Sequence, residues 1–467
     1  MAIREGGQAH RQASEEAQRQ RVKELQDTRR SVVKERAVLV EVVCVAPGEP
    51  DEKGHRNRLE ELRRLADTAG ARVVGTVTQR RRRIHPGTYI GHGKVEELLG
   101  VARAKRANVI IFDNDLTPAQ VRNLEKGTGI KTIDRSELIL DIFASRARTH
   151  EARLQVELAQ LEYTFPRLKR MWTHLSRMEG GIGTRGPGET QLESDRRIVR
   201  RRIQDLKARL ARIDARKERE VRSRGDQLTV GLVGYTNAGK SSLLNALTGA
   251  DAYVQDKLFA TLDTRTRAWP LPYGLTGLLS DTVGFIRDLP HHLVASFKAT
   301  LEEAVHARLL LHVVDASTEH VRVDLDAVAA VLGEIGCSDK PQLVALNKVD
   351  LVTDPVHLDL LERACPGSVA TSALAGTGLD RLADVVTERL AGPETEATVR
   401  ADAADGRLLA WIDQHATVLD RTIQDGCIVQ TVRLPRRLFD EIPRVAEASY
   451  TVSDVSPSDV SQGEDVA

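Results

Sequence analysis

The sequence predicts a multidomain α/β protein: a small parallel α/β domain, an antiparallel coiled-coil helical hairpin, and then a nucleotide-binding domain with a mainly parallel sheet. Three observations support this prediction. Apolar strands alternate with amphipathic helices in two separate stretches, and a seam of apolar residues at steps of three and four runs between them. A glycine-rich loop ending in Lys-Ser joins a strand to a helix. With 467 residues, the chain is long enough for about three domains.

The overall composition is that of an ordinary soluble protein, with a formal net charge of +1 and 41% hydrophobic residues. Residues 1–31 lack the apolar core of a secretory signal, and no later apolar run reaches transmembrane length. We therefore expect a cytoplasmic protein without a membrane anchor, and a monomer. The four cysteines lie far apart without metal-ligand spacing, which predicts reduced core thiols.

A charged extension, residues 1–36, precedes a small α/β domain that we predict for residues 37–148. Strands and amphipathic helices alternate there, a pattern typical of a parallel sheet. The predicted strands are 37–45, 73–77, 109–112 and 132–133, and the predicted helices lie near 57–69, 93–106 and 117–126.

Residues 149–224 predict a basic coiled-coil hairpin with a glycine-rich tip at 180–188. Pro166 should kink the first helix, while Thr190 and Glu193 form a capping box that should start the second. The first seam consists of Leu154, Leu158, Leu161, Phe165, Leu168, Trp172 and Leu175. The second seam consists of Leu192, Val199, Ile203, Leu206, Leu210 and Ile213.

A phosphate-binding loop opens the next domain, predicted for residues 225–392. Gly234 and Gly239 let the loop backbone wrap the phosphates, Lys240 should reach the β- and γ-phosphates, and Ser241 should bind Mg²⁺. The nucleotide contacts predicted here are Gly234, Tyr235, Thr236, Asn237, Ala238, Gly239, Lys240, Ser241 and Ser242.

A second motif, Asp-Thr-Val-Gly at 281–284, follows an apolar run. Asp281 should hold Mg²⁺ through a water, and the Gly284 N–H should lie where the γ-phosphate would be. A threonine between the two motifs should bind Mg²⁺ only when the γ-phosphate is present. We predict Thr261 for this role, with Thr264 as the competitor.

Two later loops predict selectivity for guanine. Asn347, Lys348 and Asp350 form an Asn-Lys-x-Asp motif after a strand. The aspartate should accept hydrogen bonds from guanine N1 and N2, which adenine cannot supply, and the lysine stem should cover the base. Ser372 and Ala373 end another strand, and their backbone should contact guanine O6. The sequence thus predicts a GTPase that binds GTP or GDP with Mg²⁺.

The residue after Gly284 is Phe285, where Ras-like GTPases place a water-orienting glutamine. Our catalytic candidates are Lys240, Thr261, Gly284 and Phe285, the last as a hydrophobic residue at the glutamine position. We predict slow hydrolysis alone and acceleration by a partner. Asn237 suggests a K⁺ near the phosphates, although an asparagine that stabilises the loop explains it equally well.

The hairpin is basic. Residues 146–224 carry 21 Lys and Arg against 11 Asp and Glu. This surplus predicts contacts with RNA phosphates, with a solvated coiled coil held by intrahelical salt bridges as the alternative. The RNA-contact candidates are Arg185 in the glycine-rich tip and Arg196, Arg197, Arg200, Arg201 and Lys207 along the second helix.

The C-terminal part gives weaker signals. Residues 391–395 are typical of a linker, and a small domain is predicted for residues 404–450. Residues 451–467 carry acids without a base, which predicts a disordered tail.

Three segments closely resemble those of HflX GTPases. They are Gly-Thr-Tyr-Ile-Gly-His-Gly-Lys-Val-Glu-Glu-Leu at 87–98, Leu-Gln-Val-Glu-Leu-Ala-Gln-Leu at 154–161, and Gly-Pro-Gly-Glu-Thr-Gln-Leu-Glu at 186–193. The likeness covers about residues 37–392. The extension before it and the stretch after it depart from the family's core pattern.

The resemblance implies a factor that binds the large ribosomal subunit, splits or rescues ribosomes under stress, and hydrolyses GTP and, more weakly, ATP. It also implies that the hairpin contacts rRNA near the peptidyl-transferase centre, with Arg185 at the deepest point. The alternative is an RNA-maturation or tRNA-associated GTPase that does not act on assembled ribosomes. A signalling or membrane-tethered GTPase is a third class, but the chain has no lipidation motif or apolar anchor to support it.

Overall fold

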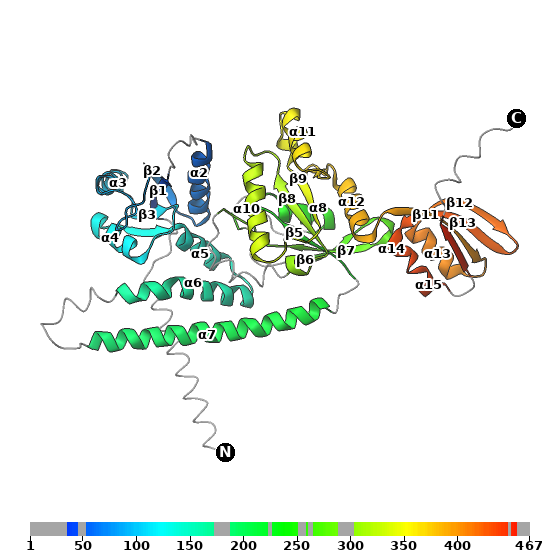
Figure 1. Cartoon of the computed structure of the whole chain (residues 1–467), viewed down its shortest axis with the longest axis horizontal. Coiled ribbons are helices and arrows are strands. Elements are labelled where there is room, and N and C mark those ends of the chain that lie inside the picture. Colours follow the sequence, from blue (N-terminus) through cyan, green and yellow to red (C-terminus); the bar gives the residue numbers. More distant parts are fainter. Residues whose placement is uncertain are drawn as a thin grey trace, which may run out of the picture. The chain divides into compact units, whose positions relative to one another are not determined.

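The structure is a computed structural model that describes residues 35–44, 53–171, 187–222, 227–250, 258–259, 265–287, 303–446 and 450–454. The chain forms two compact units, drawn in Figure 1. Unit 1 comprises Met1–Glu220, Gln255–Asp263 and Asp288–Ala299, and unit 2 comprises Val221–Val254, Thr264–Arg287 and Thr300–Ala467.

Unit 1 contains the predicted parallel α/β domain, with strand order β2-β1-β3-β4. Its strands are β1 (Arg36–Cys44), β2 (Arg72–Arg81), β3 (Val109–Phe112) and β4 (Lys131–Asp134). Its helices are α2 (Lys53–Thr68), α3 (His92–Ala104), α4 (Pro118–Thr128) and α5 (Arg135–Arg146). Apolar residues of α3 and α4 share a core with alternate residues of β1, while α2 and α5 pack against each other. Burial on both faces explains the nearly continuous apolar strands.

The hairpin consists of α6 (His150–Met171) and α7 (Pro187–Arg222). The described part of the predicted apolar seam forms its core, in which Leu154, Leu158 and Leu161 pack with Val199, Leu206 and Leu210. The side chains of the seam candidates Leu168, Trp172, Leu175 and Leu192 lie outside the described part of the chain. Glu151–Lys217 and Glu162–Lys207 ion pairs join the two helices in antiparallel order. The multidomain α/β fold class with its helical hairpin is therefore confirmed.

The start of the second helix differs from the prediction. It begins at Pro187, so Thr190 and Glu193 lie inside α7 and not at its start, where the predicted capping box would place them. Proline is favoured in the first helical turn because its ring fixes φ and its missing N–H would have no partner there. Pro166 lies inside α6, and the glycine-rich tip lies mostly outside the described residues.

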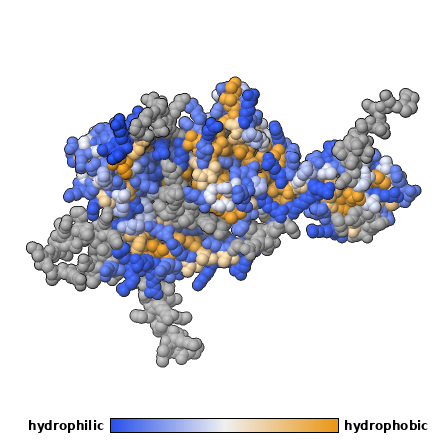
Figure 2. Space-filling model, in the orientation of Figure 1, coloured by the Kyte–Doolittle hydropathy of each residue, from blue (hydrophilic) through white to orange (hydrophobic). Residues whose placement is uncertain are grey.

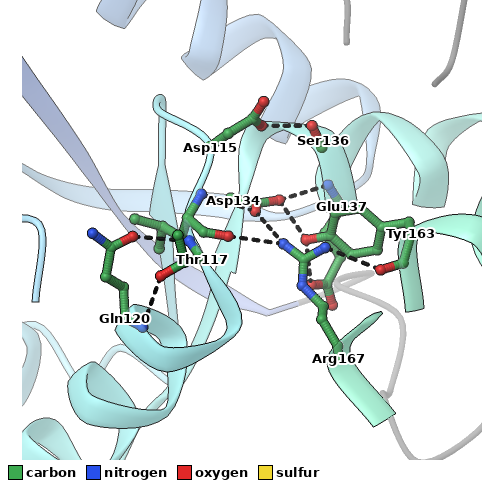
Figure 3. Close-up of polar contacts among 9 residues, drawn as sticks. Asp115, Thr117, Gln120, Asp134, Ser136, Glu137, Tyr163 and Arg167 are labelled. Atoms are coloured by element: carbon green, nitrogen blue, oxygen red, sulfur yellow. Dashed lines mark hydrogen bonds and ion pairs between the residues drawn. The ribbon is translucent and has the colours of Figure 1, made fainter. Parts of the chain in front are cut away.

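A buried polar network fastens α6 to the α/β domain (Figure 3). Its centre is Asp134, a fully buried carboxylate at the end of β4. It accepts hydrogen bonds from the Tyr163 hydroxyl at 2.7 Å and the Arg167 guanidinium at 2.8 Å, both on α6. The backbone N–H groups of Leu116 and Glu137 also donate to it. Tyr163 and Arg167, in the second half of α6, are thus joined to the end of β4 mainly through one buried carboxylate, with further bonds to Glu137 and to the Leu116 carbonyl.

Unit 2 contains a six-stranded sheet of order β10-β9-β8-β5-β7-β6, in which only β6 is antiparallel to its neighbour. The strands are β5 (Leu228–Val233), β6 (Arg265–Pro270), β7 (Thr276–Asp281), β8 (Leu309–Asp315), β9 (Gln342–Asn347) and β10 (Val369–Ala370). The helices are α8 (Lys240–Thr248), α10 (Val321–Glu334), α11 (Pro355–Ala364) and α12 (Leu379–Ala391), with short 3₁₀ turns η1 (Pro272–Gly274) and η2 (Val349–Leu351). The phosphate loop therefore leaves a central strand, where the carboxyl ends of parallel strands create a crevice.

Unit 2 also contains an antiparallel sheet of order β12-β13-β11-β14. The strands are β11 (Glu394–Asp402), β12 (Thr417–Gln424), β13 (Cys427–Pro435) and β14 (Tyr450–Asp454), and the helices are α13 (Gly406–His415), α14 (Arg436–Phe439) and α15 (Ile442–Val445). This succession and strand order are those of a ferredoxin-like fold.

Two predictions for the C-terminal part are wrong. The strand β11 begins at Glu394, inside the predicted linker 391–395, and β14 occupies the start of the predicted disordered tail. The buried residues of β11 are Ala397, Val399 and Ala401. Two of the three are alanines, so the apolar pattern of this strand in the sequence is weak. The strand is stabilised by pairing on both sides, which a local pattern cannot reveal.

All four cysteines are free, and they differ in burial: Cys337 is buried, Cys365 and Cys427 are half-buried, and Cys44 is exposed. The prediction of core thiols is therefore wrong for Cys44, which ends its strand outside the core. Among the described residues, no helix is long and apolar enough to cross a membrane, and no group of three or more His, Cys, Asp or Glu side chains is placed to hold a metal ion.

Candidate active site

The phosphate loop has a shape that only glycine allows at its two ends. Gly234 and Gly239 both have positive φ, at 150° and 93°. A Cβ on Gly234 would lie 2.2 Å from the Val313 carbonyl oxygen, and one on Gly239 would lie 2.3 Å from the Asn347 amide nitrogen. The helix α8 begins at Lys240, so its free N–H groups open toward the loop, as an anion site requires.

Lys240 is buried and folds back onto the loop. Its Nζ donates to the carbonyl oxygens of Gly234 at 2.9 Å and Tyr235 at 2.8 Å. Burial lowers the pKa of Lys240 to about 8, although the Asp281 carboxylate opposes the shift. A phosphate group would supply the negative charge that a buried ammonium needs, so the loop fits a nucleotide polyphosphate.

The residues predicted to hold Mg²⁺ are brought together in part. The Ser241 hydroxyl donates to the Asp281 carboxylate at 2.6 Å, across 40 residues of sequence. This follows from the sheet order, because β5 and β7 are neighbours and Leu232 pairs with Asp281. A hydroxyl and a carboxylate are hard oxygen donors of the kind Mg²⁺ prefers, so the pair fits that ion. The third candidate, Thr261, and its competitor Thr264 lie outside the described residues.

Gly284 lies very close to the phosphate loop. A Cβ at this position would meet the Thr236 Cα at 2.9 Å and the Lys240 Nζ at 3.1 Å. The preceding Thr282 is anchored by a hydrogen bond from its hydroxyl to the Leu232 carbonyl at 2.6 Å. The Gly284 backbone is therefore beside the group predicted to hold the γ-phosphate.

Phe285 is 2% exposed and belongs to an apolar cluster with Val233, Leu310 and Val328. Its backbone forms a parallel bridge with Tyr235 of the phosphate loop. Its ring is thus a core residue, and an apolar ring has no hydrogen bond to offer an attacking water.

The guanine motif is fixed by side chains whose partners lie far away in sequence. Asn347 donates from its amide to the Ala238 carbonyl at 2.9 Å and accepts from the Ala373 N–H at 3.1 Å. The Ser372 hydroxyl donates to the Asp350 carboxylate at 2.5 Å. Asn347 therefore ties the phosphate loop to the Ser372–Ala373 turn, and Ser372 orients the carboxylate predicted to read guanine.

Asp315 is a member of this site that sequence reasoning missed. Its carboxylate accepts from Lys348 Nζ at 2.7 Å and from the Ser317 hydroxyl at 2.6 Å. Lys348 has a positive φ of 63°, so its backbone turns sharply before the side chain returns to Asp315. An acid at the end of the strand β8 was the available signal, since the carboxyl ends of neighbouring parallel strands share an edge.

The RNA-contact candidates on α7 fall into three groups. Arg197 and Arg201 are exposed without a described ring or ion-pair contact, while Arg200 and Lys207 are exposed but have such contacts. Arg196 and Arg200 lie over the Phe165 ring at 5.4 and 5.7 Å, and Lys207 forms an ion pair with Glu162. Figure 2 shows hydrophilic residues along the outer side of the hairpin. Ion pairs between the two helices thus hold some basic residues, while others face outward. Arg185 lies outside the described residues.

Family models match most of the chain. Residues 56–144 match the model described as GTP-binding GTPase N-terminal, and residues 146–224 match the GTP-binding GTPase Middle Region. Residues 229–348 match the model described as 50S ribosome-binding GTPase, and residues 359–449 match the HflX C-terminal domain.

Curated relatives are similar over almost their whole length. GTPase HflX of Escherichia coli is 44% identical over 421 residues, which cover 88% of this chain and 97% of that protein. GTPase HflX of Caldanaerobacter subterraneus is 47% identical over 365 residues, covering 78% of this chain and 82% of that protein.

Among solved structures, a GTP-binding protein from Sulfolobus solfataricus in complex with GDP is 27% identical and covers 76% of this chain and 98% of its own. Its TM-score of 0.40 is too low for this likeness to bear on fold or function. The sequence relatives suffice: the chain belongs to the HflX family of GTPases.

Proposed function

We propose that this GTPase binds the large ribosomal subunit and splits or rescues ribosomes under stress, and that the ribosome stimulates its hydrolysis of GTP. The observation that carries the proposal is a guanine-nucleotide site in the same chain as a hairpin that exposes Arg197 and Arg201. The family model described as a 50S ribosome-binding GTPase, which matches residues 229–348, supports the choice of partner. We expect the factor to act as a cytoplasmic monomer.

Different residues of the site would bind the phosphates, the guanine base and Mg²⁺. Lys240 changes partners from the carbonyls of Gly234 and Tyr235 to phosphate oxygens, and the N–H groups of the loop donate to the phosphates. Asp350, oriented by Ser372, accepts from guanine, and Lys348, held by Asp315, lies along the base. Mg²⁺, held by Ser241 and Thr261 with Asp281 acting through a water, would neutralise charge on the phosphates.

At the position where Ras-like GTPases have a glutamine, this site has no side chain that can orient the attacking water. Gly284 offers a backbone N–H beside Lys240, but Phe285 packs in the core and cannot orient the attacking water. A partner that completes a GTPase site accelerates hydrolysis by about 10³- to 10⁵-fold in comparable enzymes. We propose that the large subunit is this partner, with the hairpin docked on rRNA near the peptidyl-transferase centre.

The deciding experiment measures GTP turnover by the full chain with and without purified large subunits. We expect strong stimulation by large subunits and little by small subunits. Sedimentation of assembled ribosomes with a GTP analogue tests splitting. Equal turnover with and without large subunits, together with unchanged ribosome profiles, would reject the proposal. Stimulation by tRNA or precursor rRNA alone would favour the RNA-maturation alternative.

The K⁺ proposal has its own test. Asn237 has a positive φ of 64° within the phosphate loop, and we propose that its side chain helps to hold K⁺ near the phosphates. Replacing K⁺ by Na⁺ at constant ionic strength should then slow hydrolysis. An unchanged rate would leave Asn237 as a residue that stabilises the loop.

A further inference from the structure

The segment 284–287, called here the docked segment, is attached to the phosphate loop at both ends. The Phe285 N–H donates to the Gly234 carbonyl at 3.1 Å, and the Thr236 N–H donates to the Phe285 carbonyl at 2.7 Å. Two reciprocal backbone bonds of this kind form a short piece of parallel ladder. The position of the docked segment is therefore determined by the phosphate loop itself.

A side chain of the phosphate loop secures the far end. The Tyr235 hydroxyl accepts a hydrogen bond from the Arg287 backbone N–H at 2.9 Å. The aromatic ring thus spans from the loop backbone to a residue three positions beyond Gly284. Sequence reasoning assigned Tyr235 only to the nucleotide contacts, and nothing in the motif requires a hydroxyl at this position.

Asp324 on α10 holds the Arg287 end of the docked segment through an ion pair. Its carboxylate pairs with the Arg287 guanidinium at 3.3 Å, and both side chains are about 85% buried, with exposed fractions of 13% and 15%. Phe285 and Ile286, between the two attachments, are 2% and 1% exposed. The docked segment is therefore held by backbone bonds, two core side chains and one shielded ion pair.

We propose that the Tyr235 hydroxyl, supported by Asp324, is a positioning group that fixes the Gly284 N–H for the γ-phosphate and so strengthens binding of GTP relative to binding of GDP. This proposal rests on the proposed contact between Gly284 and the γ-phosphate, but not on the ribosomal partner. GDP lacks the γ-phosphate and gains nothing from Gly284. Loosening the docked segment should therefore weaken binding of GTP and spare binding of GDP.

The direct test is Tyr235→Phe in the full chain, which removes only the hydroxyl. Affinities for a fluorescent non-hydrolysable GTP analogue and for fluorescent GDP are measured with Mg²⁺ present and no ribosomes. One net hydrogen bond corresponds to about a three- to tenfold change in affinity. We expect the analogue to bind that much more weakly and GDP to change less than twofold.

A matched control is Tyr273→Phe, which removes a hydroxyl that bonds Glu394 outside the site. It should leave both affinities unchanged. Asp324→Asn weakens the pair with Arg287 and should shift the analogue-to-GDP ratio in the same direction, by less than Tyr235→Phe. If Tyr235→Phe does not fold, Asp324→Asn decides the question alone.

Equal losses for the analogue and GDP would show a general structural role and overturn the proposal. An unchanged or increased preference for the analogue would overturn it as well. Because no ribosomes are present, these outcomes are independent of the test of the large subunit as partner.

Discussion

Near the carboxyl edge of the N-terminal sheet, single carboxyl groups are buried, and this burial costs free energy when the group is charged. Glu41 in β1 is 3% exposed, and its Oε1 atom is buried without a hydrogen-bond partner among the described residues. Burial raises the pKa of Glu41 from 4.5 to about 7, the nearby Asp113 carboxylate adds to the shift, and Arg58 opposes it. Asp113 and Glu61 are instead paired with Arg135 at 2.7 and 3.1 Å.

The raised pKa of Glu41 gives a prediction for the pH dependence of stability. Between pH 4.5 and 7, folded Glu41 keeps a proton that the unfolded chain releases, so the free energy of unfolding falls as the pH rises. Glu41→Gln removes that proton equilibrium and should reduce the fall by at most about 3 kcal/mol. Urea unfolding of the full chain at pH 5 and pH 7, compared between wild type and variant, measures it. Parallel pH profiles for the two proteins would contradict the assignment.

Asp134 is the opposite case, a buried carboxylate whose oxygens accept four hydrogen bonds. Asp134→Ala leaves the Arg167 guanidinium without its acid and removes the bonds from Tyr163 and two backbone N–H groups. Breaking a buried ion pair from one side costs about 3 to 5 kcal/mol. Urea unfolding should show this loss, whereas Glu60→Gln, which affects an exposed pair with Arg63 and Arg64, should change stability by less than about 1 kcal/mol. Similar effects of the two substitutions would mean that Asp134 does not anchor α6.

The sequence was informative about residues whose chemistry is local to a motif. The order of the nucleotide motifs led to Lys240, Ser241 and Asp281, which the structure brings together at the ends of β5 and β7. It did not lead to Asp315 or to the Tyr235 hydroxyl, because each acts through a partner at least 33 residues away. Such roles depend on which strands are neighbours, and a local pattern contains no strand order.

At the scale of elements, α7 separates structural arginines from candidate contact arginines. Arg202 donates two hydrogen bonds to Glu157 on α6, at 2.7 and 2.8 Å, so its guanidinium joins the two helices of the hairpin. Arg197 and Arg201 are four residues apart, lie on one face of the helix and are exposed. The two kinds of arginine should respond differently to the same chemical change.

Arg197→Gln with Arg201→Gln should weaken binding to large subunits without altering GTP turnover by the isolated protein. Each lost phosphate contact should lower the slope of log affinity against log salt by about 0.7 to 0.9. Filter binding at several salt concentrations measures the slope. The matched control, Arg63→Gln with Arg64→Gln on α2, removes the same charge from another exposed helix. Equal effects of the two double variants would reject a specific contact surface on α7.

Arg202→Gln is the third variant to compare with the double variant of Arg197 and Arg201. It should lower the stability of the hairpin while leaving the exposed face of α7 unchanged.

Element prediction succeeded where a repeated pattern was long. The apolar seam at steps of three and four predicted α6 and α7, and those of its members whose side chains the structure describes form the observed core. The strand β11 was missed because Ala397, Val399 and Ala401 give a short, weak alternation next to a Gly-Pro pair. Its identity as a central strand comes from pairing with β13 and β14.

At the scale of the whole molecule, the C-terminal sheet shares contacts with the nucleotide-binding sheet within unit 2. Tyr273 of η1 packs against the core formed by α13 and β13, and its hydroxyl donates to Glu394. Its carbonyl oxygen lies 2.7 Å from His415 Nδ1. Burial raises the pKa of Tyr273 to about 12, with the Glu394 carboxylate adding to the shift, so the phenol remains a donor at neutral pH.

These contacts predict that GDP stabilises the C-terminal sheet, although its residues are absent from the nucleotide motifs. Binding at one hundred times the dissociation constant adds about 2.7 kcal/mol to the stability of whatever unfolds together with the site. If unit 2 opens cooperatively, amide hydrogen exchange in the central strands β11 and β13 should slow along with exchange in β5 and β8 when GDP and Mg²⁺ are added. Tyr273→Ala removes the ring and its hydrogen bond, and should reduce the effect on β11 and β13 while leaving that on β5 and β8. Protection confined to residues 228–392 in the wild-type chain would instead mean that the two sheets open independently, and the C-terminal sheet would then not sense the nucleotide through η1.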